Sequence, residues 1–208
     1  MSENLSSRDF ATDRSDPYRA AFQSRSLSNR QLLLIAGVTV FAVGSRILPT
    51  SWLSFTCLIS LAVFSGAVLP SRFGWLLPLL ARIITDAAFH LKTGHGYFNS
   101  WPFDYSSYIL IYFMCRNLPV RQYSAVMGRT VGALALYFVL SNLGVWMMED
   151  FHPHTFAGLM GCYISAIPFV RGMVIGNLIA APVFFFLWNA VSATECVMEG
   201  APASATNR

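Results

Sequence analysis

Six long apolar segments divide the central part of the chain. A helix of about 20 mostly apolar residues can cross the hydrocarbon core of a bilayer, and these segments come close to that length. Charged residues make up only 12% of the chain, whereas a soluble domain carries about 25%. We therefore predict an all-α, polytopic membrane protein with six transmembrane helices. The predicted helices cover residues 31–48, 52–69, 73–91, 105–118, 124–148 and 168–191.

The two ends of the chain have a different composition from this central part. Residues 1–30 are polar and mixed in charge, and they contain neither an apolar core nor a signal-peptide cleavage pattern. Such a segment buries too little apolar surface to fold by itself, and residues 192–208 are similar. We expect two disordered cytoplasmic tails, 1–30 and 192–208, around one transmembrane domain at 31–191.

The Arg and Lys residues predict the orientation of the helices. With the N-terminus in the cytoplasm, the outer side holds Arg46, Lys92 and Arg171, while Arg82 falls within the third segment. Cytoplasmic loops of membrane proteins are enriched in Arg and Lys. We expect a multi-pass protein of the cell membrane, the inner membrane in a Gram-negative cell, with both termini cytoplasmic. The cytoplasmic side then holds Arg8, Arg14, Arg19, Arg25, Arg30, Arg72, Arg116, Arg121, Arg129 and Arg208.

The third segment contains two opposite charges, Arg82 and Asp86, spaced four residues apart. This spacing places both side chains on one face of a helix. Ionisable groups inside a membrane are costly, and they usually pair, face the interior of the helix bundle and mark a functional site. We predict a buried pair that lines a polar cavity. The alternatives are a structural clasp between helices, or an Arg82 side chain that extends to the inner surface.

Two longer loops are expected on the outer side. The first, residues 92–104, is rich in glycine and aromatic residues and includes Trp101 and Asp104. It could close over a planar ligand, or it could supply an aromatic belt at the membrane surface. The second, residues 149–167, contains a stretch after His154 that is apolar but too short to cross a membrane. We predict a short re-entrant or interfacial helix there, between the fifth and sixth spans, with Thr155 as its N-cap.

These features predict an outward-facing site for a small molecule. Aromatic rings can stack on a planar ligand, and the amide of Asn142 can both donate and accept a hydrogen bond. In the alternative, Asn142 bonds to neighbouring backbone and the tryptophans face lipid. The candidate ligand-binding residues are Arg82, Asp86, Trp101, Asp104, Asn142, Trp146, His152 and His154.

Other classes of site have weaker support. The outer side also holds four histidines and two carboxylates, but they lack the spacing of a known metal motif, so we expect no metal and no cofactor. No catalytic motif is present, and the chain is not expected to be an enzyme. Without a dense basic run, nucleic acid is not an expected partner. The residues weighed for a metal are His90, His95, His152, His154, Glu149 and Asp150.

Three stretches carry a resemblance to a known family: the region around Asp86, the sequence SNLGVW at 141–146, and the sequence HPHTFAGLMGCYISAIPFVRGMVIGNL at 152–178. Over residues 32–191 the chain resembles an uncharacterised family of six-helix bacterial membrane proteins, known as a domain of unknown function. That family is similar in size, span number and threading to the substrate-binding S components of energy-coupling-factor vitamin transporters.

The expected function is therefore a small-molecule binding or uptake component in the lipid bilayer. The alternative is a structural or assembly protein that docks a membrane partner subunit through residues 152–178.

Overall fold

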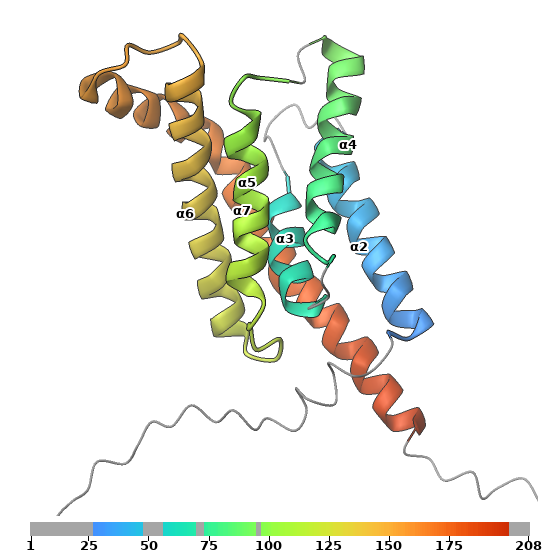
Figure 1. Cartoon of the computed structure of the whole chain (residues 1–208). Helices are drawn as coiled ribbons and strands as arrows, with labels where there is room; N and C mark the ends of the chain where they lie inside the picture. Colours follow the sequence, from blue (N-terminus) through green and yellow to red (C-terminus); the bar gives the residue numbers. More distant parts are fainter. Residues whose placement is uncertain (1–26, 48–55, 70–72, 95–96, 200–208) are drawn as a thin grey trace, which may run out of the picture.

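The computed structural model describes residues 27–47, 56–69, 73–94 and 97–199 (Figure 1). These residues form helices and connecting loops without a strand, so the predicted all-α class is confirmed. Most of the predicted tails, together with residues 48–55, 70–72 and 95–96, lies outside the described residues. The helices are α2 (Asn29–Ile47), α3 (Leu58–Val68), α4 (Leu76–Thr93), α5 (Trp101–Cys115), α6 (Tyr123–Met148) and α7 (Phe156–Glu199).

Three of these helices are long and apolar enough to cross a membrane: α2, α6 and α7, the last over Phe156–Thr194. The other three are too short or too charged to qualify. Helix α3 has 11 residues, about 16 Å of length, against the roughly 30 Å of a hydrocarbon core. Helix α5 has 15 residues, and α4 carries three charged side chains. The chain is therefore associated with a membrane through at least these three apolar helices.

Helix α3 forms the centre of the bundle. All of its residues except Ala67 are buried, and it contacts every other helix of the described structure. Apolar residues surround α3 on all sides instead of forming one stripe, as expected of a helix enclosed by others. Phe64 packs edge-on against three aromatic rings of α7, those of Phe184, Phe185 and Trp188. The observed helix α3 is therefore shorter than the helix predicted at 52–69, because α3 begins at Leu58, inside the bundle.

Asn177 of α7 holds the start of α3. The first turn of a helix exposes amides that lack partners within the helix. The Oδ1 of Asn177 accepts a hydrogen bond from the Ser60 amide at 2.7 Å, and its Nδ2 donates to the Thr56 carbonyl at 2.8 Å. The Ser60 hydroxyl also donates to the Asn177 carbonyl at 2.9 Å. A buried side chain of α7 therefore fixes the point where α3 begins.

Helix α7 differs most from the prediction. The predicted short helix at 155–167 and the sixth span form one continuous helix of 44 residues, with Pro168 and Pro182 inside it. The prediction of a separate short helix is therefore wrong. The predicted N-cap is confirmed, because the Gly158 amide donates a 3.1 Å hydrogen bond to the hydroxyl of Thr155. Figure 1 shows the first turns of α7 lying across the end of α6 before the helix descends through the bundle. Proline can bend a helix without ending it when the surrounding helices hold both halves.

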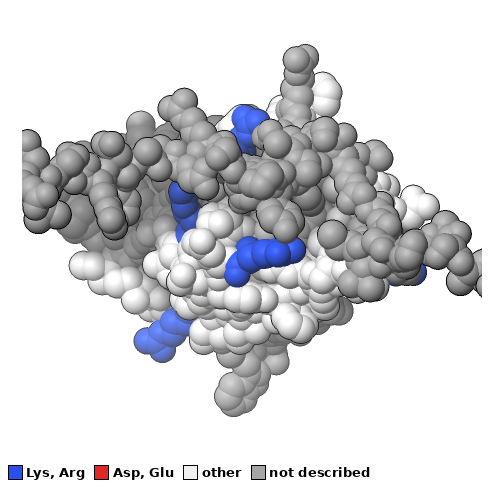
Figure 2. All heavy atoms as spheres, turned by 90° about the horizontal axis from the view of Figure 1, so that it is seen from below, with Lys and Arg blue, Asp and Glu red and all other residues white. Residues whose placement is uncertain are grey.

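The bundle has two ends with different composition. The upper end in Figure 1 carries the connection between α6 and α7, and the lower end carries the start of α2, the end of α7 and the connection between α5 and α6. Figure 2 views the lower end, where Lys or Arg side chains are visible and no described acidic residue is in view. The acidic residues Glu149 and Asp150 lie instead in the connection between α6 and α7, at the upper end.

Candidate functional site

Asp86 stands at the centre of a buried cluster of charges. It lies on α4, and its side chain is only 5% exposed. Its Oδ2 accepts hydrogen bonds from Nε of Arg82 at 2.8 Å and from the hydroxyl of Tyr105 at 3.2 Å. Its Oδ1 accepts from a guanidinium nitrogen of Arg46, on α2, at 2.8 Å. The predicted Arg82–Asp86 pair is therefore confirmed, and it is part of a larger arrangement.

Arg82 extends this cluster to α5 and α6. Besides Asp86, its guanidinium donates to Oδ2 of Asp104 at 3.2 Å and to the hydroxyl of Tyr137 at 3.3 Å. Its Cζ also lies 5.8 Å from the centre of the Tyr108 ring, a distance typical of a cation–π contact. We call the six hydrogen-bonded residues the charge network: Arg46, Arg82, Asp86, Asp104, Tyr105 and Tyr137.

The charge network is electrically balanced, with two arginines and two carboxylates. Removing a charge from water costs several kcal/mol, and a buried pair recovers this cost only with good geometry and further hydrogen bonds. The guanidinium of Arg82 meets that condition, because it has contacts with two carboxylates and a phenol. The network therefore joins α2, α4, α5 and α6 and carries no net charge itself.

Sequence reasoning missed three members of the network. Arg46 was placed at the outer end of the first predicted helix but was not linked to Asp86, although it stands in the last turn of α2 and donates to the Asp86 carboxylate. The sequence did offer a signal for this contact, because the orientation of the predicted helices places Arg46 and Asp86 toward the same end of the bundle. Tyr137 lies in an apolar stretch, where a tyrosine more often serves as packing, and Tyr105 lies in a loop-like stretch that was interpreted as part of an aromatic belt. Only the packing of α5 against α4, and of α6 against α5, brings their hydroxyls to the charges.

A small cavity lies between α6 and α7, next to the charge network. Its volume is about 230 Å³. Tyr137 belongs to both features, because it lines this cavity and its hydroxyl accepts a hydrogen bond from Arg82. We call it the α6–α7 cavity. Its lining residues are Tyr137, Phe138, Ser141, Asn142, Ala166, Phe169, Val170 and Met173.

Asn142 supplies polar atoms to the wall of the α6–α7 cavity. Its Nδ2 donates to the carbonyl of Phe138 on its own helix at 2.7 Å, and the hydroxyl of Ser141 donates to the same carbonyl at 3.5 Å. Within the described part of the chain, Oδ1 of Asn142 has no hydrogen-bond partner. The expectation that Asn142 bonds to backbone is therefore met on its donor side, and its acceptor remains available.

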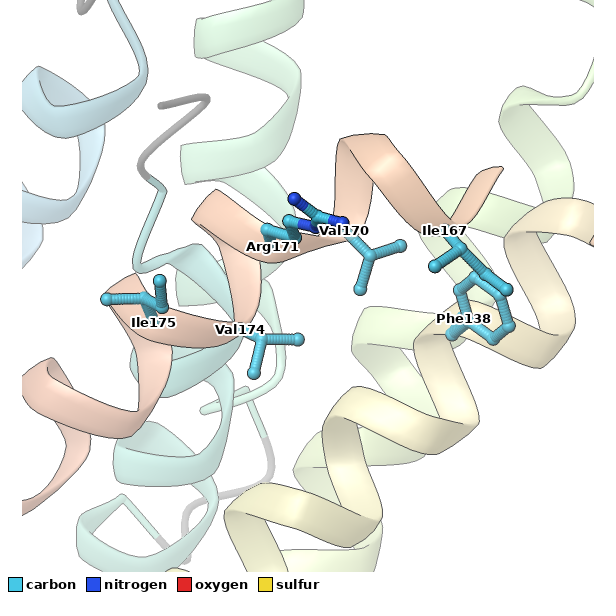
Figure 3. Close-up of a pocket in the computed structure, with 6 residues that line it drawn as sticks. All are labelled: Phe138, Ile167, Val170, Arg171, Val174 and Ile175. Atoms are coloured by element: carbon cyan, nitrogen blue, oxygen red, sulfur yellow. The ribbon is translucent and has the colours of Figure 1, made fainter. Parts of the chain in front are cut away.

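An apolar groove adjoins the cavity on the same side of the bundle. It has a volume of about 490 Å³ and shares Phe138 and Val170 with the cavity. In Figure 3, Val170 and Val174 of α7 point toward α6, where Ile167 approaches Phe138. We call it the Arg171 groove, because Arg171 is the one charged residue in its lining.

A family model described as a family of unknown function, DUF6580, matches residues 26–198. The chain belongs to the DUF6580 family. No curated protein and no solved structure matches it.

The predicted site residues of this DUF6580 protein separate into three groups. Arg82, Asp86 and Asp104 meet in the charge network, and Asn142 lines the neighbouring cavity. Trp101 is 52% exposed, and its ring lies 5.6 Å from that of Tyr105, so it touches only the edge of the network.

The third group, Trp146, His152 and His154, makes contacts at the connection between α6 and α7. The indole nitrogen of Trp146 donates to the carbonyl of Pro153 at 3.1 Å, and its ring stacks edge-on with that of His154 at 5.5 Å. His152 lies 3.4 Å from the hydroxyl of Ser165. None of these three side chains lines the α6–α7 cavity.

The two loops that were predicted to lie on the outer side meet in the structure of this DUF6580 protein, as the predicted site requires. The amide of Ser100 donates to a carboxylate oxygen of Glu149 at 3.2 Å. Below this contact, Gly144 of α6 packs directly against the ring of Phe103, and a larger side chain would clash there. The loops are therefore joined by direct contacts of their own residues.

The described histidines and acids form no metal-binding group. No cluster of three or more His, Cys, Asp or Glu side chains occurs within the described residues. His90 instead packs its ring against that of Tyr97 at 5.3 Å, and His95 lies outside the described residues. The absence of a metal remains a prediction.

Proposed function

We propose that this protein is a membrane-embedded component that binds a small molecule for uptake, with the α6–α7 cavity as the binding site. One observation carries the proposal: Tyr137 joins the cavity to the charge network, because it lines the cavity and its hydroxyl accepts a hydrogen bond from Arg82. Ligand sites are mostly apolar concave surfaces with a few polar groups that set the orientation of the ligand. The cavity has this composition.

The lining of the cavity defines the chemistry of its ligand. No charged side chain lines it, so the part of the ligand that enters is uncharged. The available Oδ1 of Asn142 calls for a hydrogen-bond donor on the ligand, such as a hydroxyl or an amide. Phe138 and Phe169 offer aromatic surfaces, on which a planar ring system can pack. A small, neutral, planar molecule with one donor group fits these requirements.

In this proposal the charge network positions the site without contacting the ligand directly. Sites keep their geometry when the lining residues are held by further hydrogen bonds and packing. Arg82 holds the hydroxyl of Tyr137, and Asp86 and Asp104 in turn hold Arg82. The proposal assigns no chemical reaction to the chain.

We further propose that all six helices lie within the membrane, with the upper end outside the cell and both termini cytoplasmic. Helices α3, α4 and α5 are individually too short or too charged to span alone, but α3 is enclosed by the others, and Arg82 and Asp86 of α4 are paired inside the bundle. The arginines visible at the lower end support a cytoplasmic lower face. The proposed helix number and threading resemble those of the S components of vitamin transporters, and this resemblance is the reason that we propose uptake as the role.

A second function is favoured by the exposed side chains at the start of α7. Phe156 is 77% exposed, Ile164 66% and Phe169 76%. An apolar surface of this kind can dock a membrane partner subunit, which would make the chain an assembly protein that uses residues 152–178. A stoichiometric partner in mild detergent, together with no bound small molecule, would favour this function.

Mass spectrometry of small molecules that co-purify with the full chain tests the uptake proposal. We expect one neutral compound in wild-type protein and its loss in Asn142→Leu, which keeps the side-chain volume but removes the acceptor. Asn99→Leu, the same change at an exposed residue outside the cavity, is the matched control and should retain the compound. Wild-type protein that holds no compound, in cells whose uptake of vitamins is unchanged by loss of the chain, would contradict the proposal.

A further inference from the structure

Arg171 is an exposed charge on an apolar helix. It lies on α7 between side chains that are themselves exposed and apolar, with Phe169 76% exposed and Ile175 46%. Within the described residues its guanidinium has neither an ion pair nor a hydrogen bond. Arg129, another exposed arginine within a helix, donates instead to the carbonyl of Met114. Arg171 therefore needs a partner from outside the described chain.

The depth of Arg171 in the membrane increases the cost of leaving its charge without a partner. Its groove is walled by Phe138, which lies ten residues before the last residue of α6, or about 15 Å along the helix. Helix α6 has 26 residues and is about 39 Å long, longer than the roughly 30 Å of a hydrocarbon core. With α6 across the membrane, Arg171 therefore starts below the level of the lipid headgroups. An arginine there extends its side chain toward the headgroups and attracts an anion.

The Arg171 groove has the chemistry of a site for an amphiphile. Five apolar side chains surround the base of the arginine, from Phe138 of α6 and from four positions of α7 (Figure 3). An acyl chain can lie along such a surface. The planar guanidinium binds the oxygens of a phosphate with two parallel hydrogen bonds. Lipid phosphate is the anion present in every bilayer at the height that the Arg171 side chain reaches.

We propose that the Arg171 groove binds an anionic phospholipid, with an acyl chain against Phe138, Val174 and Ile175 and the phosphate on Arg171. The charge of Arg171 sets the preference for a lipid of net negative charge over a zwitterionic lipid. The site is separate from the α6–α7 cavity, although Phe138 and Val170 belong to both. It does not depend on the proposed uptake function.

Native mass spectrometry of the purified full chain tests this site. The protein is titrated in detergent with phosphatidylglycerol or with phosphatidylcholine that has the same acyl chains, and the affinity for the first bound lipid is measured. Both lipids offer a phosphate to Arg171, but the choline ammonium of phosphatidylcholine is repelled by the guanidinium. We therefore expect phosphatidylglycerol to bind about tenfold more tightly. Arg171→Gln should lower its affinity to that of phosphatidylcholine. Arg116→Gln, the same change at the connection between α5 and α6, should leave the preference intact.

A second pair of variants tests the groove itself. Ile175→Trp fills the groove without changing charge and should weaken the binding of both lipids. Ile179→Trp, one turn further along α7, is the matched control because Ile179 is equally apolar, 56% exposed and outside the groove. Each variant must keep the wild-type helix content by circular dichroism to be compared.

Three results would overturn the proposal: equal affinity for the two lipids, a preference that survives Arg171→Gln, or binding unaffected by Ile175→Trp. A stoichiometric protein subunit or a second copy of this chain that occupies the groove in the same spectra would also overturn it.

Discussion

Arginine occurs on an apolar helix in two contrasting regions of this protein. In the charge network, Arg82 lies inside the bundle with a side chain that is 9% exposed and has contacts with two carboxylates and a phenol. In the Arg171 groove, an arginine on the outside of α7 has no such contacts within the described residues. In the first region, partners within the protein neutralise the charge of Arg82, and these contacts stabilise the fold. The second leaves its charge available, which is what a binding surface requires.

This contrast predicts the largest effect for Asp86. Asp86→Ala would remove the acceptor shared by Arg46, Arg82 and Tyr105 and leave two positive charges without their main partner. Breaking a buried ion pair in this way costs about 3–5 kcal/mol. We expect a clear loss of expression and of thermal stability in detergent. Asp150→Ala, at an exposed residue of the upper end, should have no effect, and equal stability of the two variants would break the contrast.

A smaller effect is expected for Tyr137. Tyr137→Phe keeps the ring in the cavity wall but removes the hydroxyl that accepts from Arg82. A hydrogen bond to a charged group contributes about 1.5–3 kcal/mol, and the remaining contacts of Arg82 should hold the loss near the lower limit. Thermal unfolding in detergent measures this loss. Tyr123→Phe, at an exposed residue of the lower end, is the control. No difference between the two would mean that Tyr137 does not couple the network to the cavity.

The smallest effect on folding is expected for Arg171. Arg171→Gln removes a charge that has no partner within the described chain, so the stability of lipid-free protein in detergent should change by less than about 0.5 kcal/mol. The same thermal measurement checks this. A loss comparable to that of Asp86→Ala would show that Arg171 is a structural residue, and the difference between the two regions would disappear.

Much of the helical structure was predictable because a local signal specifies it. Runs of apolar residues placed the cores of all six helices, and the four-residue spacing of Arg82 and Asp86 predicted their ion pair. Two predicted helix boundaries were wrong, one at a proline and one at a buried helix start. Pro168 was taken as a helix start, but the helix continues through it. The second span was taken as full length, but described α3 starts only at Leu58, inside the bundle.

The candidate site was less predictable than the helices. Of the predicted ligand residues, Asn142 lines the α6–α7 cavity, whereas Trp146, His152 and His154 hold the connection above it. Tryptophan and histidine at a membrane surface look alike in sequence whether they contact a ligand or a neighbouring carbonyl. Their role depends on the direction in which each side chain points.

The amino-acid sequence by itself determined that this chain is helical and associated with a membrane, because apolar length and charge content are properties of each segment alone. It also determined that Arg82 and Asp86 pair, since one turn of helix brings them together. Tertiary structure alone decided that Arg46 and Asp104 join them and that Arg171 is left without a described partner. These contacts join residues up to 40 positions apart. They depend on how the helices rotate and pack against one another, which no single segment encodes.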